Sequence, residues 1–446
     1  MLSYRKLAMR VLGRPLHTEG IDSPRPASQR AAAFALTAAM LITLSAPAFA
    51  DIWHIENGDI TISAGESGNN VTQNNNTTYG DTNTIITNQN KDTASSHTVT
   101  IETNDKNDKV EVTLKDVNID TSSRNKAAVS VTGSGNTTIK LDGDNALKSD
   151  SSRSGIYGSG SLTITGGEND SLTAQGGSGA NGIYSSGSLT ISGGSTVTAN
   201  GGNGTISGGN GIYSDSGDVT ISGGSTVTAK GGDGGSFGGG SGISSFNRVA
   251  ISGSTVTANG GDSSSNSGGY GISSLDVAIS GGTVKAAGGN GKNGNGGNGI
   301  IGSGRVAISG GTVNAAGGDG GNGKDGGYGI ISNDIDLSGS LELTAKAGSP
   351  NGKALSRAGS ELVLDTIKDK LGPGAKVTAT DADGKVIDQV STPRPVEPEE
   401  SSSSSDGGSA APSAPVSPLP GLTVTDKDGQ RISYTSTQSG NTLTVC

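Results

Sequence analysis

The dipeptide Gly-Ile recurs along the middle of this 446-residue chain at nearly constant intervals. Its glycines are Gly155, Gly182, Gly211, Gly242, Gly271, Gly299 and Gly329, with successive spacings of 27, 29, 31, 29, 28 and 30 residues. Each unit contains three short, β-branched pieces separated by glycines, as in GIYSSG, SLTISGG and STVTANGGNG, and none has a helical period. A repeat of this length predicts a quasi-one-dimensional stack of coils.

Four rows of aliphatic residues occupy matching positions in the seven units. They begin at Ile156, Leu162, Ile164 and Leu172, and each alternates with polar residues, which places the aliphatic side chains inward. A disordered chain would not keep four such rows in register. We therefore predict an all-β protein, a right-handed parallel β-helix (β-solenoid) of roughly 29-residue coils stacked about 4.8 Å apart.

The composition agrees with a thin tube. Only 30% of the residues are hydrophobic and 3% are aromatic, while 77 are glycine, so there is too little apolar material for a rounded core. We expect the glycines to form corners that need a positive φ. The net charge of −10 argues against nucleic acid and anionic lipid as partners. The single cysteine, Cys446, cannot form an internal disulfide.

The ends of the chain differ from the repeats. Residues 1–50 have a basic flank, a short apolar run and a small-x-small ending, which predict a signal peptide cleaved after Ala50, with Met9 as an alternative start. We expect a secreted or cell-surface protein without a membrane span after cleavage, an uncleaved anchor being the alternative. The Pro/Ser-rich residues 392–421 predict a disordered linker, and 422–446 a short β fragment of a truncated or longer module.

Between these ends we expect one continuous stack. Residues 51–154 carry alternating strands joined by Asn/Asp/Thr-rich turns and are predicted to form irregular N-terminal coils and a cap. Residues 155–391 hold the regular coils and a C-terminal cap with a hairpin around Asp383-Gly384.

The order of the repeated pieces resembles a known group. DITIS, KVEVTLKDVNI and NTTIKLDGDNALKS, followed by repeated G-I-x-S, L-T-I-S-G-G and T-V-T-A-x-G-G, are similar to secreted bacterial carbohydrate-binding-domain proteins over roughly residues 55–390. The resemblance implies a pectate-lyase-like right-handed β-helix that binds acidic sugars and calcium without cleaving the polysaccharide. Asn-Gly replaces the Asp-Asp-Gly turns of that group, as at Asn181-Gly182, which removes carboxylates that calcium would use.

Three tyrosines form the first candidate binding site. Tyr157, Tyr184 and Tyr213 occupy one position in three consecutive coils and alternate with inward isoleucines, so they are expected to face outward. An exposed aromatic row suits the stacking of sugar rings. A ladder of tyrosines stacked on one another is the alternative.

A column of alternating charge forms the second candidate. The residue before the middle strand is Asp218, Arg248, Asp276, Arg305 and Asp334 in successive coils. The column predicts either a solvated charge ladder or an arginine pair, Arg248 and Arg305, that binds the carboxylates of an acidic glycan.

Asn or Asp follows a Gly-Gly pair in five coils, at Asn203, Asp233, Asp262, Asn290 and Asp319. Such side chains commonly cap turns. The competing hypothesis is a calcium site with Asp233, Asp262 and Asp319 as ligands, joined by Asp325 from the partial calcium-binding repeat Gly320–Asp325. Calcium is the only cofactor that the sequence suggests.

Catalytic residues are difficult to assemble from this sequence. None of the three histidines lies in a regular repeat, and no Ser-His-Asp set or His/Cys metal spacing is present. Asp334 and Asp336 share a strand face, and Arg248 lies between acidic positions, as a lyase site would require. We predict a non-enzymatic protein that binds polysaccharide, either an acidic glycan or host or cell-wall surface glycans. A structural or adhesive array is the second hypothesis, and a polysaccharide lyase the third.

Overall fold

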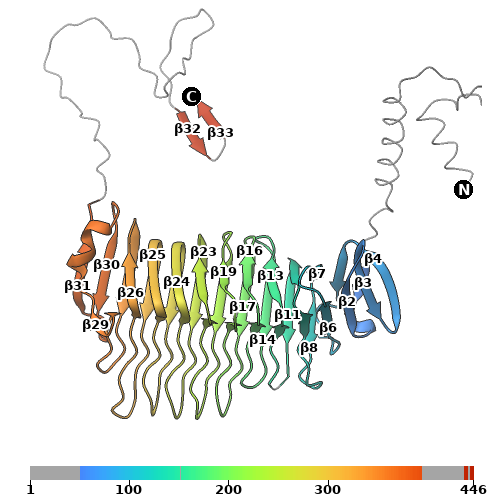
Figure 1. The fold of residues 1–446 in the computed structure, drawn as a ribbon, viewed down its shortest axis with the longest axis horizontal. Coiled ribbons are helices and arrows are strands. Elements are labelled where there is room, and N and C mark those ends of the chain that lie inside the picture. Colours follow the sequence, from blue (N-terminus) through green and yellow to red (C-terminus); the bar gives the residue numbers. More distant parts are fainter. Residues whose placement is uncertain (1–50, 151, 394–435, 440–441, 446) are drawn as a thin grey trace, which may run out of the picture. The chain divides into compact units, whose positions relative to one another are not determined.

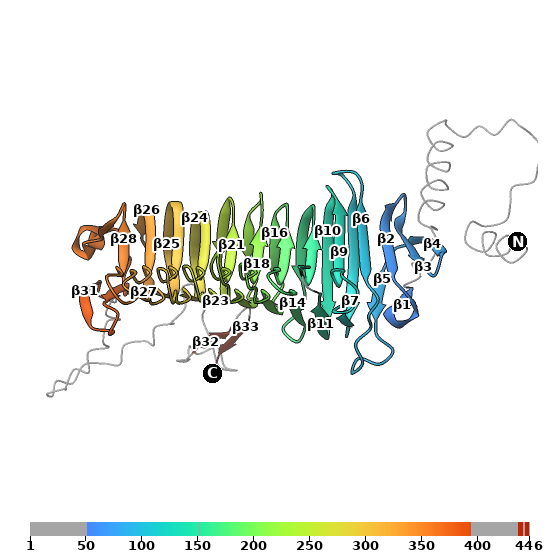
Figure 2. The ribbon, with the colours of Figure 1, turned by 90° about the horizontal axis from the view of Figure 1, so that it is seen from below.

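The computed structural model describes residues 51–150 and 152–393, together with the two short strands Ser436–Ser439 and Thr442–Val445. The predicted signal peptide, the linker beyond residue 393 and Cys446 lie outside the described residues. The structure is 52% strand and 3% helix and contains about 11 turns of about 29 residues. The predicted parallel β-helix is confirmed (Figures 1 and 2).

Three strands per coil pair in parallel with the matching strands of the next coil, which gives three faces that we call sheets 1, 2 and 3. Sheet 1 contains β2 (Ile60–Gly65), β6 (Val99–Thr103), β9 (Val129–Gly133), β12 (Ile156–Gly158), β15 (Ile183–Ser185), β18 (Ile212–Ser214), β21 (Ile243–Ser245), the first parts of β24 (Ile272–Ala287), β25 (Ile300–Ala316) and β26 (Ile330–Leu337), and β28 (Leu355–Arg357).

Sheet 2 contains β1 (Ile52–His54), β5 (Thr84–Thr87), β7 (Lys109–Lys115), β10 (Asn136–Asp142), β13 (Ser161–Thr165), β16 (Leu189–Ser192), β19 (Val219–Ile221), β22 (Arg248–Ile251) and the continuations of β24, β25 and β26. Sheet 3 contains β8 (Asn118–Asp120), β11 (Asp144–Lys148), β14 (Ser171–Gln175), β17 (Thr196–Asn200), β20 (Thr226–Lys230), β23 (Ser254–Asn259), the last parts of β24 and β25, β27 (Leu341–Lys346) and β30 (Lys376–Thr380).

The four predicted aliphatic rows form the core. Every member of the rows that begin at Ile156, Leu162, Ile164 and Leu172 is at most 2% exposed, and matching members pair directly, as Ile221 does with Ile251 through β19 and β22. The sequence analysis missed a fifth inward row, which consists of Ala174, Ala199, Ala229, Ala258, Ala286, Ala315 and Ala345. The regular coils thus have five inward apolar rows, and the alanine position is occupied by the larger Ile119 and Leu147 in the N-terminal coils.

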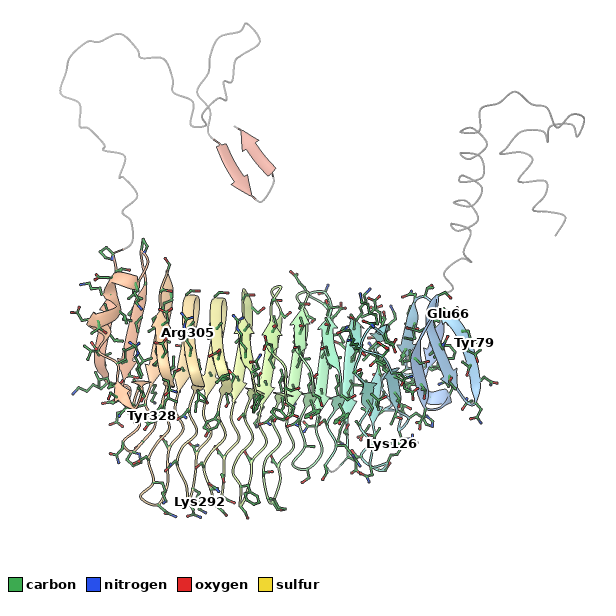
Figure 3. The ribbon with its side chains drawn as sticks, in the orientation of Figure 1. Glu66, Tyr79, Lys126, Lys292, Arg305 and Tyr328 are labelled. Carbon is green, nitrogen blue, oxygen red and sulfur yellow. The ribbon has the colours of Figure 1, made fainter. Side chains whose placement is uncertain are left out.

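Long segments join sheet 3 of one coil to sheet 1 of the next, and we call them arms. Short arms span 121–128, 149–155, 176–182 and 347–354, and long arms span 201–211, 231–242, 260–271, 288–299 and 317–329. Figure 1 shows the long arms as wavy segments below β23, β24 and β25, and Figure 3 shows Lys292 at the end of one arm.

The outgoing and returning halves of the long arms are hydrogen-bonded to each other and to the next coil. The Gly231 N–H donates to the Asn259 carbonyl of the next coil (2.8 Å), the Gly232 N–H donates to Gly209 of the preceding coil (2.8 Å), and the Gly240 N–H donates back to Gly232 (2.9 Å). Successive N–H groups of the Gly-Gly-X pattern thus donate to different neighbouring segments. This arrangement is typical of polyproline-II-like chains packed side by side.

Close backbone approach is the reason for glycine in the arms, which corrects the prediction that every glycine corner needs a positive φ. A Cβ on Gly240 would lie 1.9 Å from the Gly209 carbonyl oxygen, and one on Gly232 would lie 2.1 Å from that of Gly202, although neither glycine has a positive φ. The prediction is right at the corner between sheets 2 and 3, where Gly223 has a φ of 70°.

Antiparallel strands close both ends of the stack. At the N-terminal end, β2 pairs with β3 (Gly68–Gln73), which pairs with β4 (Asn76–Asp81), beside the 3₁₀ helix η1 (Ile55–Asn57). At the other end, β28 pairs with β29 (Ser360–Glu361), the 3₁₀ helix η2 (Leu364–Lys370) follows, and β30 pairs with β31 (Val386–Ser391). The last pair is the hairpin predicted around Asp383-Gly384.

The C-terminal segment contains one described hairpin. β32 (Ser436–Ser439) and β33 (Thr442–Val445) pair antiparallel to each other.

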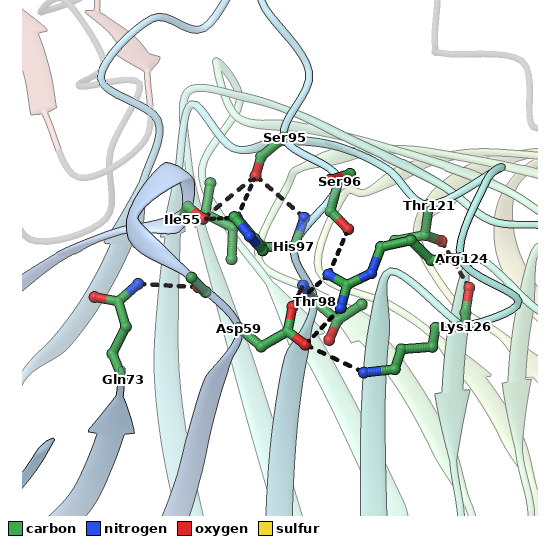
Figure 4. Close-up of polar contacts among 11 residues, drawn as sticks. Ile55, Asp59, Gln73, Ser95, Ser96, His97, Thr98, Thr121, Arg124 and Lys126 are labelled. Carbon is green, nitrogen blue, oxygen red and sulfur yellow. Dashed lines mark hydrogen bonds and ion pairs between the residues drawn. The ribbon is translucent and has the colours of Figure 1, made fainter. Parts of the chain in front are cut away.

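An ion-pair cluster fixes the N-terminal cap to the next coils (Figure 4). Asp59 accepts hydrogen bonds from the guanidinium of Arg124 (2.6 and 2.9 Å), from Lys126 Nζ (3.1 Å) and from the Thr98 N–H (2.9 Å). Burial raises the pKa of Asp59, but the bonds from Arg124, Thr98 and Lys126 outweigh it and hold this pKa far below its ordinary value. The charged form of Asp59 is therefore part of the folded structure.

Candidate functional site

A groove of about 940 Å³ lies on the outer side of sheet 1, and two of the three predicted tyrosines line it. We call it the tyrosine groove. The residues that we use to describe it are Thr100, Lys126, Ser130, Thr132, Arg153, Tyr157, Ser178, Tyr184, Thr205 and Ile206. Tyr213 is not among the lining residues.

The groove exists because the arms change length. Its floor is the outward face of β6, β9, β12 and β15, where the arms of 149–155 and 176–182 are short. The first long arm, 201–211, then forms a wall through Thr205 and through Ile206, whose side chain is 59% exposed. A step in arm length thus creates a recess on sheet 1 of a nearly uniform solenoid.

The tyrosine rings stack on one another along the coil axis. The centroids of Tyr157 and Tyr184 are 5.0 Å apart and their planes differ by 7°, whereas Tyr184 and Tyr213 are 5.7 Å apart and tilted by 56°. The column continues from Tyr157 to the smaller Ser130 in β9. One face of each stacked ring is covered, so the face of Tyr157 that points toward Ser130 is the open aromatic surface; Tyr157 is 41% exposed.

The other two tyrosine hydroxyls have polar partners. Tyr213 donates to Asp215 Oδ1 (2.9 Å), and Tyr184 Oη lies 3.1 Å from Ser186 Oγ. Burial together with the bond to Asp215 raises the pKa of Tyr213 to about 12. The structure therefore contains the predicted tyrosine ladder, in which Tyr157 is exposed and Tyr184 and Tyr213 are half-buried.

Two cations lie at the edge of the tyrosine groove. Arg153 is exposed, its Nε donates to Asn125 Oδ1 (3.2 Å), and within residues 51–150 and 152–393 it forms no salt bridge. Lys126 also lines the groove but is paired with Asp59. Arg153 is thus available to an anionic group above the tyrosine face.

The predicted arginine pair lies elsewhere, on sheet 2. Arg248, Asp276, Arg305 and Asp334 are direct neighbours in successive coils, so a carboxylate separates the two arginines. The Arg305 guanidinium bonds to Asp336 and lies 3.9 Å from Asp334. The bond from Arg305 is the main reason that the pKa of Asp336 is lowered.

Further cations complete this column. Arg357 pairs with Asp334 at 2.8 Å, and Lys370 lies 3.5 Å from Asp336. The arrangement is a ladder of alternating charge, and it engages both carboxylates that the sequence offered for acid–base chemistry.

The proposed calcium ligands also form a ladder. Asp233 Oδ1 accepts from the Asp262 N–H (3.0 Å), Asp262 Oδ1 from the Asn290 N–H (2.7 Å), and Asp319 Oδ1 from the Ser349 N–H (2.8 Å). Asp325 is engaged separately by Asn351 Nδ2 (3.0 Å). Within the part of the chain that the structure describes, no three His, Cys, Asp or Glu side chains gather in a metal-binding group.

No protein-family model matches this chain, and neither a curated protein nor a solved structure shows significant similarity to it. Among the described residues, no helix has the length and apolar character needed to cross a membrane. The function therefore has to follow from the chemistry of the site.

The sequence analysis did not single out Lys126, Arg153 or Ile206. The available signal was the short spacing of 27 residues between Gly155 and Gly182 compared with 29 between Gly182 and Gly211, the unit that contains the wall. Differences in repeat length mark where an arm shortens and where its neighbour becomes a wall.

Proposed function

We propose that this protein is a secreted or cell-surface, non-enzymatic binder of acidic polysaccharide, with the tyrosine groove as its site. The observation that carries the proposal is that the exposed Arg153 and the exposed Tyr157 line one recess, which is walled by the first long arm.

The groove offers the three kinds of contact that an acidic sugar needs. The C–H face of a pyranose ring packs on the exposed face of Tyr157, which is apolar. Arg153 binds a carboxylate through its planar fork of donors. The hydroxyls of Ser130, Thr132 and Thr100 on the floor both donate and accept hydrogen bonds, as sugar hydroxyls require. A volume of about 940 Å³ is suited to a short run of sugar units.

A structural array is the second candidate function, because the five long arms form a repeated lattice without a large interruption. A rigid rod of this kind serves as a spacer or adhesin stalk without any ligand in the groove. Binding measurements separate the two candidates.

The test is binding of polygalacturonate, alginate and hyaluronate to the full chain, with dextran as the neutral control. We expect at least one acidic polymer to bind and dextran not to bind. Arg153→Gln and Tyr157→Ser should each weaken that binding about tenfold, since each removes one main contact. Tyr79→Ser is the matched control, because Tyr79 is 78% exposed on the N-terminal cap (Figure 3). Binding of none of the polymers would favour the structural array.

The tyrosine ladder makes a sharper prediction. Replacing Tyr157, Tyr184 and Tyr213 together by Ser should weaken binding little more than Tyr157→Ser alone, because Tyr157 is the exposed ring in the groove, Tyr184 is half-buried and Tyr213 does not line the groove. A triple variant that loses far more affinity than the single variant would instead favour a chain lying along the whole row.

Two further measurements separate a binder from a calcium-dependent protein and from a lyase. EDTA should leave the affinity unchanged, because the Asx oxygens are bonded to the backbone of the next coil. Incubation with polygalacturonate should release no unsaturated products that absorb in the ultraviolet; their appearance would identify a lyase.

A further inference from the structure

A second groove, of about 1060 Å³, lies on the opposite side of the same short arms. It runs between the outward face of sheet 3 and the bases of the arms. Lys148, Gln175, Asn200 and Lys230 line it and pair in successive coils, which gives a row of nitrogen-bearing side chains about 4.8 Å apart. Within the row, Lys148 pairs with Asp120 (2.9 Å) and Gln175 Nε2 donates to the Gly176 carbonyl (2.9 Å). We call it the amide groove. Lys230 is exposed at one end of the ladder, and Asp150 is the one carboxylate among the lining residues.

One residue connects the two grooves. Ser178, at the exposed tip of the short arm 176–182, lines both the tyrosine groove and the amide groove. Its hydroxyl donates to the Asn203 carbonyl of the first long arm (2.9 Å), which holds the tip against that wall. The short arm has about three residues in each direction, so at about 3.1 Å per residue its tip stands only about 9 Å above the strands. The two grooves therefore meet at this tip, where the arm between them is short.

A third groove of about 880 Å³ also begins at Ser178 and follows the outgoing halves of the long arms. Asp233, Asp262 and Asp319 line it, with Lys292 as its cation. Three exposed carboxylates disfavour a polyanion there, whereas the tyrosine and amide grooves both carry basic side chains. Charge thus selects the path over the short arm rather than the path along the long arms.

We infer that one acidic polysaccharide chain binds in both the tyrosine groove and the amide groove, crossing the solenoid over the tip of arm 176–182. The inference rests on the proposed function. It assigns the Gln175, Asn200 and Lys230 column to the same ligand as Arg153 and Tyr157, and it directs the polymer across the coils instead of along their axis. Two linked contact regions on one polymer raise the affinity beyond either region alone.

The test compares galacturonate oligomers of increasing length with polygalacturonate, by titration calorimetry on the full chain. In the wild type the affinity should rise steeply once an oligomer is long enough to span both grooves. The double variant Gln175→Ala with Lys230→Glu should lose on the order of tenfold in affinity for the polymer and none for the shortest oligomer that binds. Asp262→Asn, in the acidic groove, is the control and should change neither affinity.

A second variant blocks the path without altering Arg153, Tyr157, Gln175 or Lys230. Exchanging Gly176–Gly182 for a copy of the long arm 201–211 continues the glycine lattice by one coil and raises the tip. This variant should lose the gain in affinity with length while keeping a normal thermal unfolding curve.

The outcomes separate the inference from the proposed function. If Arg153→Gln weakens binding but the Gln175/Lys230 variant binds the polymer as the wild type does, the crossing path is wrong and the tyrosine groove stands. If neither change has an effect, both fail. If Asp262→Asn strengthens polymer binding as strongly as the Gln175/Lys230 variant weakens it, the chain follows the long arms, and the crossing path is again wrong.

Discussion

The three-sheet body and the long-arm lattice stack the same coils by different means. In the body, rows of Ile, Val, Leu and Ala exclude water from the tube, and β-branched residues suit the strands. In the lattice, a Cβ on Gly209, Gly232 or Gly240 would lie 1.9–2.1 Å from a neighbouring carbonyl oxygen, and hydrogen bonds between backbones take the place of side-chain packing. A chain with 30% hydrophobic residues can thus specify an ordered structure, because the arms need no hydrophobic core.

The difference also locates the candidate site. The sheets keep the same register from coil to coil, because a slip of one residue would turn every side chain to the other face. Arm length varies from coil to coil, because a lattice built from three-residue turns can be shortened without disturbing the sheets. The tyrosine groove lies on sheet 1 at the place where the short arm 176–182 is followed by the first long arm, 201–211.

The largest effect is expected in the body. Ile251→Asp places a charge in a row where Ile251 is 1% exposed and packs directly between Ile221 and Ile279. Without a partner, this buried charge should lower the free energy of unfolding by several kcal/mol. Thr228→Asp, on the outward face of the neighbouring sheet, should change it little. A circular-dichroism melt of Ile251→Asp that matches the wild type would contradict the inward assignment.

A smaller and more local effect is expected in the lattice. Gly240→Ala introduces a methyl group 1.9 Å from the Gly209 carbonyl oxygen, so the arm must shift, at a cost of about 1–3 kcal/mol. Limited proteolysis should then cleave the arm 231–242 while the sheets keep their circular-dichroism signal. The matched control is Gly158→Ala in β12, where the nearest atom is 3.5 Å away. Equal behaviour of the two variants would mean that the arms are not closely packed.

The N-terminal cap should respond to pH. Because the pKa of folded Asp59 lies below its unfolded value of about 3.9, its contribution to stability is present above about pH 3.9 and is lost as the pH falls toward the folded pKa. Asp59→Asn should therefore lower the melting temperature at pH 6, and this difference should shrink at pH 2.5. Asp142→Asn, which breaks the half-exposed pair with Lys115, is the control and should show a smaller difference at pH 6.

The smallest effect is expected from the charge ladder on sheet 2. Arg305→Gln removes the contacts with Asp334 and Asp336, but the arginine side chain is 53% exposed, and exposed pairs contribute about 0–1 kcal/mol. The loss should be measurable at low salt and disappear in 1 M salt, which chemical denaturation in urea can follow. A loss that persists at high salt would indicate packing instead of charge.

The sequence predicts the body of the fold better than it predicts the arms and the site. The amino-acid sequence shows the four aliphatic rows and their alternation with polar residues, and every member of these rows is buried in the structure. The alanine row was missed because Ala is equally common on outward faces, and the lattice was missed because Gly-Gly-X is also typical of flexible turns. The recess depends on which arms lie side by side in space. No sequence motif contains Arg153, Ile206 and Tyr157 together, so the sequence could not predict that they line one groove.

Hydrogen–deuterium exchange of the full chain with and without polygalacturonate tests the central claim most directly. Without ligand, the amides of the long arms should exchange as slowly as those of the sheets, since both are hydrogen-bonded between coils. With ligand, additional protection should appear around Lys126, Arg153–Tyr157, Ser178–Tyr184 and Gly204–Ile206, and the coils beyond Ile300 should not change. Protection spread evenly along the stack, or confined to the coils around Arg305, would contradict the assignment of the tyrosine groove as the binding site.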